Sequence, residues 1–499
     1  MAAEIELKLN LPPRAVRKLL THPRLQGCRR QQQHLDNVYF DTPELTLRKA
    51  QLALRQRRVG RHCLQTVKAG GAMAGGLAHR GEWEEPIAPG KFDFSAIDDK
   101  AVRKRLKNCR DQLQPLFTTD YRRITWQVAG PAESAIELAL DRGTIESQGR
   151  RTKIRELELE LRQGEPAALF ALARELQQTL PGVRPAASSK DERGYALWLD
   201  RPLPPCKVTL PTIGARQSTA EAFASLANAC LQQLQKNEEG MLESDDPEYL
   251  HQMRVAIRRL RSALQLFKPV LPASFVEQWT PLWRDLGRQL GKARNWDVFA
   301  TQMLPPLAAA LPGQAEIQLL IRASEHQQAL CRQTLRSAIR SAAHARLLLD
   351  FSAALVSPPF VDAPERAHAA PAADDLDDFA LRRLKRQAKR AKAWASRVRE
   401  LDAGERHQMR IAFKKLRYAL EFFAPFLPTR RLKPYHKKLA GLQDTLGELN
   451  DLQGTAALLA RVGKPDGVAG AWFAARHEGL LALLPEKVDR FLDRRTPWR

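Results

Sequence analysis

Short segments in which apolar and polar residues alternate fill the chain from about residue 3 to residue 161. These segments are EIELKL, LALRQR, CLQTVK, EWEEPI, ITWQVA, AIELAL and ELELEL, separated by turn-like stretches such as VGR and AGGAMAGG. Alternation with a period of two is typical of strands that have one face in a core. The pattern therefore predicts a multi-stranded antiparallel sheet, followed by a helix over residues 166–180.

Helical periodicity replaces the strand pattern beyond about residue 218, and Leu, Ala, Gln and Arg become frequent. The Pro-rich stretch RPLPPCKVTLP precedes this change and is typical of an interdomain linker. We therefore predict an α+β multidomain protein, in which a closed antiparallel β tunnel or barrel with helices precedes an all-α duplicated bundle. The predicted parts are a strand domain over 1–205, a linker over 206–217 and a helical domain over 218–495.

The helical part contains an internal repeat. The segment HQMRVAIRRLRSALQLF, which starts at His251, returns as HQMRIAFKKLRYALEFF from His407. Likewise LGKARNWD from Leu290 returns as LGELNDLQ from Leu446, and both pairs are separated by 156 residues. A constant separation indicates a duplicated unit. We place the two repeats at about 218–355 and 374–495, joined by the Pro/Ala-rich stretch 357–373.

Charge narrows the possible partners. The 499 residues carry a net charge of +24 with a pI near 10.1, which indicates a polyanionic partner such as nucleic acid, an anionic membrane or polyphosphate. The six cysteines show no metal-binding or C-x-x-C spacing, and the chain has no apolar run long enough to span a membrane. We expect a cytoplasmic protein without a membrane segment.

Charged side chains recur at alternate positions of the predicted strands and therefore share strand faces. These sets are Glu4 with Glu6 and Lys8, Arg55 with Arg57, Thr66 with Lys68, Arg80 with Glu82 and Glu84, and Glu156 with Glu158 and Glu160. One interpretation is a solvated sheet face with ion pairs, and the other is a polar barrel interior. Carboxylates suit Mg²⁺ or Mn²⁺, whereas Lys and Arg bind phosphate oxygens, so the second interpretation predicts a metal–triphosphate site.

The strand region resembles the CYTH family, also called triphosphate tunnel metalloenzymes, over residues 1 to about 200. The resemblance rests on E-x-E-x-K at Glu4–Lys8, followed in order by YFDT, LALRQR, T-x-K, R-x-E-x-E, TDYRR, LDRG, ELELEL and SKDERGYAL. It implies a closed antiparallel tunnel through which the triphosphate passes. The expected activity is hydrolysis of inorganic triphosphate, although relatives hydrolyse thiamine triphosphate or cyclise ATP.

The resemblance also implies roles for individual residues. The metal ligands would be Glu4, Glu6, Glu158 and Glu160. Second-metal or water-orienting carboxylates would be Glu82, Glu84, Asp141 and Glu156. The triphosphate would be held by Lys8, Arg55, Arg57, Lys68, Arg80, Arg123, Lys190 and Arg193.

Basic residues form one stripe on each copy of the repeated helix. At 100° per residue, the first stripe falls within an arc of about 80°. The stripes consist of His251, Arg254, Arg258 and Arg261, and of His407, Arg410, Lys414 and Arg417. Solvation could explain such a face. However, like charges on adjacent turns repel each other, and the repetition of this cost suggests that an anion offsets it.

This half resembles the CHAD domain, a duplicated helical bundle that binds inorganic polyphosphate, over about residues 215–495. The stripes and the two LG elements, with Arg294-Asn295 and Asn450-Asp451, carry the resemblance. It implies that the two stripes and Arg294 bind polyphosphate, and that the protein associates with polyphosphate granules. Two alternatives remain open, a non-catalytic polyphosphate-binding protein and a nucleic-acid binder. The stripes lack the aromatic residues on which bases stack, so we expect only weak, non-specific binding of nucleic acid.

Overall fold

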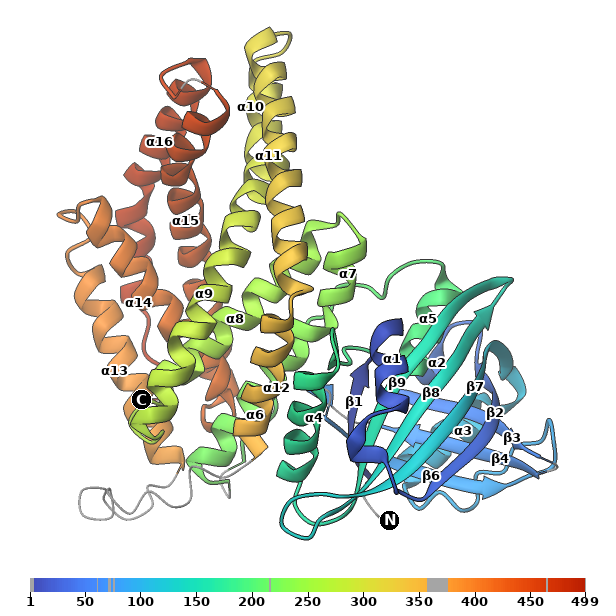
Figure 1. Ribbon diagram of the computed structural model, residues 1–499. Helices are drawn as coiled ribbons and strands as arrows, with labels where there is room; N and C mark the ends of the chain where they lie inside the picture. Colours follow the sequence, from blue (N-terminus) through green and yellow to red (C-terminus); the bar gives the residue numbers. More distant parts are fainter. Residues whose placement is uncertain are drawn as a thin grey trace. The chain divides into compact units, whose positions relative to one another are not determined.

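A computed structural model describes residues 4–60, 62–70, 73–74, 77–214, 217–356, 376–463 and 465–498 (Figure 1). The side chains of Glu4, 73–74 and 77–80 and the predicted connector 357–373 lie outside the described part. The chain forms two compact units. Unit 1 comprises Met1–Lys207, Leu231–Gln252 and Ala338–Pro358, and unit 2 comprises Val208–Cys230, Met253–Ser337 and Pro359–Arg499.

Unit 1 is built on one antiparallel sheet. Its strands are β1 (Glu4–Asn10), β2 (Arg30–Asp41), β3 (Leu52–Val59), β4 (His62–Ala69), β5 (Met73–Ala74), β6 (Leu77–Pro86), β7 (Gln114–Ala129), β8 (Ala135–Ser147), β9 (Arg150–Gln163) and β10 (Arg184–Pro185). Its helices before residue 200 are α1 (Pro13–Leu20), α2 (Thr46–Lys49), α3 (Lys100–Cys109), α4 (Ala167–Thr179) and α5 (Lys190–Leu199). The predicted antiparallel sheet and the helix over 166–180 are confirmed.

The strand pairings lead around the sheet and return to their start. Neighbouring strands follow the order β1, β9, β8, β7, β2, β3, β4, β6. A further pairing joins β6 back to β1, from Glu4 opposite Arg80 to Leu7 opposite Leu77. This ring of pairings is the arrangement that a tunnel-like fold requires. One face of each strand points into the ring and the other points outward.

The outward faces of the ring carry the apolar residues of the alternating segments. In β1, Leu7 and Leu9 are fully buried, and they share a core with Leu157 and Leu159 of β9. Residues of α1 and α4 complete this core. Because apolar side chains occupy the outward face, the charged residues between them point into the ring. Both faces of β1 are therefore buried, the apolar face in the core and the charged face inside the ring. This explains why Glu6, on the charged face, is only 5% exposed.

The YFDT motif has a structural role at the end of β2. The buried Asp41 carboxylate accepts hydrogen bonds from the backbone nitrogens of Thr42, Leu47 and Arg48, at 2.7, 2.8 and 2.9 Å. It also accepts one from the Tyr195 hydroxyl of α5, at 2.8 Å. The carboxylate thus joins β2 to the short helix α2 and to α5.

We expect Asp41→Ala to lower the free energy of unfolding by about 3 kcal/mol, because it leaves several buried donors without an acceptor. Urea denaturation followed by circular dichroism measures this change. Glu44→Ala, at an exposed position three residues later, serves as the control and should change stability by less than about 0.5 kcal/mol. Equal stability of the two variants would contradict the structural role of Asp41.

The remainder of the described chain is helical, as predicted. Its helices are α6 (Thr219–Lys236), α7 (Glu238–Glu243), α8 (Pro247–Phe267), α9 (Ala273–Val298), α10 (Leu304–Ala310), α11 (Ala315–Ile339), α12 (Ala342–Val356), α13 (Leu376–Ala395), α14 (Ala403–Phe422), α15 (Thr429–Val462) and α16 (Val468–Leu492). A π-helical segment, Phe299–Met303, follows α9. None of the helices in the described ranges is long and apolar enough to cross a membrane.

The repeat is visible in the core of unit 2. Phe223 and Phe267 of the first repeat have counterparts 156 residues later in Phe379 and Phe423. The rings of Phe267 and Phe423 are 5.8 Å apart between centroids, and those of Phe267 and Phe379 are 5.2 Å apart. Equivalent aromatic residues of the two copies therefore pack against one another, which explains why these positions are apolar in both copies.

Candidate functional site

A cavity in unit 1 is lined mainly by charged side chains, most of them from strands and two from the start of α5. Its charged residues are Glu6, Lys8, Arg55, Arg57, Lys68, Glu82, Arg123, Glu158, Lys190 and Asp191. Tyr39, Tyr121, Thr66, Ala53 and Ser189 complete the lining. Residues predicted to bind metal and residues predicted to bind triphosphate therefore meet around one cavity.

Lys190 lies at the centre of a carboxylate cluster. Its Nζ is 2.8 Å from Asp141 Oδ2, 2.6 Å from Glu156 Oε2 and 2.8 Å from Glu158 Oε1. The residue stands at the first position of α5, where Ser189 caps the helix in a capping box with Glu192. Burial alone would lower the pKa of Lys190, but the three carboxylates raise it well above its ordinary value. The ammonium group therefore stays charged.

Glu158 of β9 connects three cations. It accepts hydrogen bonds from Lys8 Nζ at 2.9 Å and from Lys190 Nζ at 2.8 Å, and it also pairs with Arg123. Burial would raise the pKa of Glu158, but Lys190, Lys8 and Arg123 hold it well below its ordinary value. Glu158 therefore remains a carboxylate and fixes the positions of cations that face the cavity.

Asp141 and Glu156 hold cations from behind the cavity lining. Arg123 donates two hydrogen bonds of 2.7 Å to Asp141, from Nε and Nη2. Arg193 Nη1 donates to Glu156 Oε1 at 2.7 Å. Neither carboxylate nor Arg193 lines the cavity itself. Together with Glu158, Asp141 and Glu156 also place three oxygens within 4.8 Å of one another, with Lys190 between them.

The strands β3, β4 and β6 contribute a second group of cations with two carboxylates. Lys68 Nζ is 2.7 Å from Glu82 Oε2, and Arg55 Nη2 is 3.5 Å from Glu82 Oε1. Burial lowers the pKa of Arg57, and the neighbouring Arg55 lowers it further. Thr66 Oγ1 donates to Glu84 Oε2 at 2.9 Å. Positive charge is therefore in excess on this side, where an anion would be stabilised.

Three carboxylates form a row across β1, β9 and β8. Glu160 pairs in register with Glu6 on one side and with Glu137 on the other. Burial raises the pKa of Glu160, although Arg162 opposes the shift, and Glu137 and Glu6 raise it further. Cations contact all three: Lys8 Nζ is 3.0 Å from Glu6, and Arg162 is 3.1 Å from Glu137 and 2.6 Å from Glu160. A row of carboxylate oxygens nevertheless fits a hard divalent cation. Glu137 was missing from the predicted ligands because its strand, AIELAL, carries only one acidic residue.

Two of the predicted residues, Glu4 and Arg80, are described by their backbone alone. Glu4 and Arg80 pair in register at the junction of β1 and β6, but their side chains lie outside the described part. Sequence reasoning also missed Asn37 of β2. Its side chain accepts a 2.9 Å hydrogen bond from Arg57 Nε and donates to Thr119 Oγ1 at 3.0 Å, so it orients that guanidinium.

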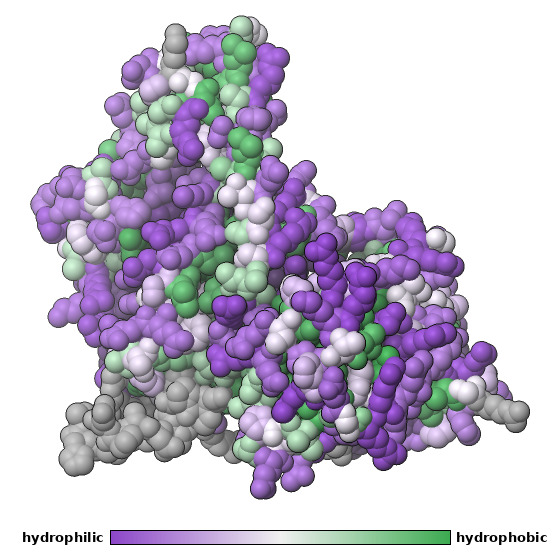
Figure 2. Space-filling model, in the orientation of Figure 1, coloured by the Kyte–Doolittle hydropathy of each residue, from purple (hydrophilic) through white to green (hydrophobic). Residues whose placement is uncertain are grey.

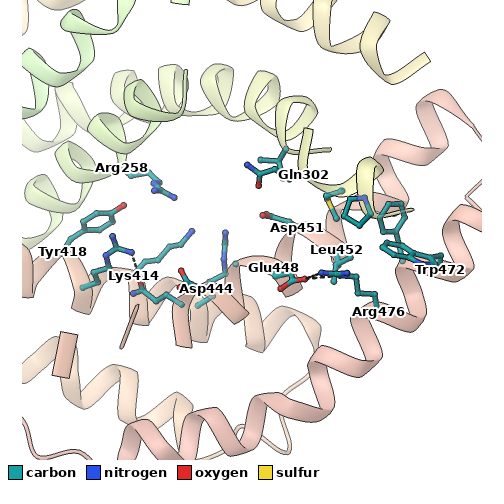
Figure 3. Close-up of a pocket in the computed structure, with 18 residues that line it drawn as sticks. Arg258, Gln302, Lys414, Tyr418, Asp444, Glu448, Asp451, Leu452, Trp472 and Arg476 are labelled. Atoms are coloured by element: carbon teal, nitrogen blue, oxygen red, sulfur yellow. Dashed lines mark hydrogen bonds and ion pairs between the residues drawn. The ribbon is translucent and has the colours of Figure 1, made fainter. Parts of the chain in front are cut away.

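A second cavity, of about 490 Å³, lies in unit 2 and is also lined by predicted residues (Figure 3). Arg258 of α8 and Lys414 of α14 point into it from opposite sides in Figure 3. Arg410 and Arg417 of α14 line it as well. The two basic stripes thus contribute unequally, with one residue from the first and three from the second.

Positive charge in this second cavity is only partly compensated. Burial and the neighbouring Arg410, Arg258 and Arg254 lower the pKa of Lys414 to about 6. Outside the lining, burial and the neighbouring Arg258 and Arg410 lower the pKa of Arg254 to about 10. The buried Nε atoms of Arg258 and Arg410 have no hydrogen-bond partner among the described residues. An anion in the cavity would supply such partners.

The helix α15 adds acidic side chains to the lining of this cavity. Asp444, Glu448 and Asp451 line it, and Glu448 accepts a 2.7 Å hydrogen bond from Arg476 of α16. Trp472 of α16, which Figure 3 shows near Arg476, lines the cavity as well. These residues were not among the predicted binding residues, although Asp451 belongs to the repeated LG element.

The other members of the basic stripes do not line the second cavity. They are His251, Arg254, Arg261 and His407, and Arg294 of the first LG element is also absent from the lining. Arg254 Nη1 donates to the Gly287 carbonyl at 3.3 Å, and His407 Nδ1 lies 3.2 Å from Asn450 Oδ1. Close packing explains the glycine at 291, because a Cβ there would lie 2.5 Å from Arg254 Nη1.

Comparisons with known proteins match two successive parts of the chain to two domain models. Residues 2–195 match the CYTH domain model, and residues 225–460 match the CHAD domain model. The chain therefore contains a CYTH domain followed by a CHAD domain.

Several relatives share parts of the chain. An inorganic triphosphatase of Haemophilus influenzae is 32% identical over 202 residues, which are 40% of this chain and 55% of that protein. The chain thus spans about half the length of this curated relative. An uncharacterized protein of Mycobacterium tuberculosis is 28% identical over 420 residues, covering 77% of this chain and 75% of that protein. The crystal structure of a CHAD domain from the plant Ricinus communis is 30% identical, with a TM-score of 0.47, and covers 57% of this chain and 94% of that one.

Proposed function

We propose that unit 1 hydrolyses inorganic triphosphate with a bound divalent metal ion, and that the CHAD domain binds inorganic polyphosphate. The main support for triphosphate hydrolysis is the cavity of unit 1, which is lined by six Lys and Arg side chains together with carboxylates. The name of the Haemophilus relative, an inorganic triphosphatase, supports the same activity.

In the proposed tunnel, the cations that line the cavity hold the phosphate oxygens. Lys8, Arg55, Arg57, Lys68, Arg123 and Lys190 all line it. Charge-assisted hydrogen bonds from such groups stabilise the charge on a transferring phosphoryl group. Arg193 acts differently, because it contacts Glu156 instead of the cavity and so positions the cluster around Lys190. Arg80 keeps its expected role as a phosphate-binding residue.

The proposed metal ligands are the carboxylates predicted from the sequence, namely Glu4, Glu6, Glu158 and Glu160, joined by Glu137. A bound Mg²⁺ or Mn²⁺ would neutralise phosphate oxygens and activate a water molecule. Among the four carboxylates expected to orient that water, Glu82 lines the cavity. We therefore assign that role to Glu82 and assign positioning roles to Glu84, Asp141 and Glu156.

Phosphate release from inorganic triphosphate tests the first part. We expect turnover with Mg²⁺ or Mn²⁺ and none with a chelator. In Glu6→Gln/Glu160→Gln, the metal concentration that gives half-maximal rate should rise about tenfold to a hundredfold, because two charged ligands become neutral. Glu44→Gln, an exposed substitution in the same unit, serves as the control. Turnover that continues in the chelator would contradict the proposed metal dependence.

The same measurement distinguishes the proposed triphosphatase from the alternative, a protein that only binds polyphosphate. If the intact chain binds polyphosphate but releases no phosphate with either metal, the protein is a non-catalytic polyphosphate-binding protein. For the binding part, the support is the cavity lined by Arg258, Arg410, Lys414 and Arg417, with two buried guanidinium nitrogens that lack partners among the described residues. Granule association would follow from polyphosphate binding and is tested by co-sedimentation with granules.

A further inference from the structure

Helix α13 carries a concentration of positive charge that neither candidate cavity uses. Its basic residues are Arg382, Arg383, Lys385, Arg386, Lys389, Arg390 and Lys392. The acidic residues Asp377 and Asp378 lie only in its first turn. Figure 2 shows mostly hydrophilic side chains over the visible part of this helix.

The equivalent helix of the first repeat has a different face. The separation of 156 residues places Ala227, Cys230 and Leu234 of α6 opposite Arg383, Arg386 and Arg390 in the alignment of the two copies. In the first copy these positions are buried, with exposures of 0%, 1% and 0%. In the second copy Arg386 and Arg390 are exposed. The same helix face is therefore buried in the first repeat and forms a cationic surface in the second.

The cationic face of α13 forms one wall of a groove of about 400 Å³. Arg383, Arg386 and Arg390 line it together with Lys268, which follows α8, and Lys415 of α14. The other residues that line it, as far as the structure describes them, are glutamine and proline, so it contains five cations and no carboxylate. We call this groove, defined by these five cations, the α13 groove.

Charge in the α13 groove is not compensated by the protein. Burial lowers the pKa of Arg383, and Arg386 and Arg390 lower it further. Burial and Arg390 lower the pKa of Lys415. The buried Nε of Arg383 has no hydrogen-bond partner in the described part of the chain, and neither has Oε1 of Gln387, a groove residue that is 4% exposed. The cations of the groove therefore repel one another, and two of its buried polar atoms can still form hydrogen bonds with a ligand.

We propose that the α13 groove is a second binding site for the phosphate chain of inorganic polyphosphate. Arg383, Arg386 and Arg390 follow one another along about 10 Å of helix, at 1.5 Å per residue. A polymer with about one charge per phosphate can contact all three in succession. Nucleic acid fits less well, because no aromatic side chain lines the described groove for base stacking.

The groove is separate from the cavity that contains Arg258 and Lys414. The two sites share no lining residue. Lys414 lines the cavity, whereas Lys415, about 100° further around α14, lines the groove. This inference does not depend on triphosphate hydrolysis in unit 1, nor on polyphosphate binding in the cavity.

Binding of fluorescently labelled long-chain polyphosphate to the full chain at 0.15 M salt tests the proposal. We expect Arg383→Gln/Arg386→Gln/Arg390→Gln to bind about tenfold more weakly, since three partly exposed charge contacts are lost. The matched control is Lys385→Gln/Lys389→Gln/Lys392→Gln, which removes the same charge from the same helix outside the groove. It should bind within about twofold of the intact chain.

Two further variants keep the result interpretable. Arg386→Gln/Arg390→Gln changes only exposed residues, so it tests the groove if the triple variant melts at a lower temperature. Arg410→Gln/Lys414→Gln removes cations of the other cavity. Residual binding by this variant that the groove substitutions abolish would demonstrate two independent sites.

Several outcomes would overturn the proposal. Equal weakening by the groove variant and its matched control would mean that only net charge matters. Complete loss of binding in Arg410→Gln/Lys414→Gln would leave the cavity as the binding site. Displacement of polyphosphate by single-stranded nucleic acid at equal phosphate concentration would identify the groove as a nucleic-acid site. Phosphate release from triphosphate, measured in parallel, reports separately on the tunnel.

Discussion

Replacement of Lys190 by methionine should destabilise the protein by about 3–5 kcal/mol and reduce triphosphate hydrolysis by about 10²–10³-fold. The ammonium group lies within 2.8 Å of oxygens of Asp141, Glu156 and Glu158. Removing one partner of a buried ion cluster leaves the other charges without full compensation, and this costs several kcal/mol. The expected loss of rate follows because Lys190 also lines the cavity in which we place the triphosphate.

Urea denaturation measures the stability change, and phosphate release measures the rate. Lys18→Met, at an exposed position of α1, is the matched control. It should change stability by less than about 0.5 kcal/mol and the rate by less than about twofold. Unchanged stability in Lys190→Met would mean that Arg123, Arg193 and Lys8 compensate the carboxylates without it.

The same variant should respond to divalent metal differently from the intact chain. Asp141, Glu156 and Glu158 each place one oxygen within 4.8 Å of the others, around the position that Lys190 occupies. Without the ammonium group, these oxygens form a set that suits Mn²⁺ or Mg²⁺. Ligand binding to the folded state raises stability by mass action. The urea midpoint of Lys190→Met should therefore rise with Mn²⁺ more steeply than that of the intact chain.

Much of the fold could be predicted because local pattern and tertiary structure agree. Alternation in EIELKL and ELELEL predicted strands, and their leucines pack outward beneath α1 and α4. By contrast, β2 was not among the predicted strands. Its first residues, RQQQH, are exposed and carry no apolar alternation, because their strand position depends on pairing with β7.

The site could be predicted less completely than the fold. Charge type and spacing indicated which residues face the cavity, including Lys8, Arg55 and Lys68. Spacing along one strand could not reveal partners on other strands. The contact between Asn37 and Arg57 and the register that joins Glu137 to Glu160 depend on how strands far apart in sequence align. The unequal contribution of the two basic stripes likewise depends on how the helices pack.

Polyphosphate affinity of the cavity in unit 2 should fall about fifty-fold between pH 6 and pH 8. The pKa of Lys414 in the free protein is lowered to about 6 by burial and by Arg410, Arg258 and Arg254. Lys414 is therefore half protonated at pH 6 and about 1% protonated at pH 8. A phosphate chain favours the charged form and raises this pKa, so binding takes up a proton. The apparent affinity is proportional to the fraction of protein in which Lys414 is protonated, so it falls as the pH rises.

Loss of the pH dependence in a Lys414 variant, and not its direction, distinguishes Lys414 from other basic groups, because loss of a proton from any of them would weaken polyanion binding. Long chains are needed for the measurement, because their internal phosphates stay ionised throughout this range. Lys414→Met should remove the pH dependence and bind at all pH values about as weakly as the intact chain does at pH 8. Lys437→Met, at an exposed position of α15, should retain the full dependence. Affinity that rises with pH, or a dependence that persists in Lys414→Met, would show that another group controls binding.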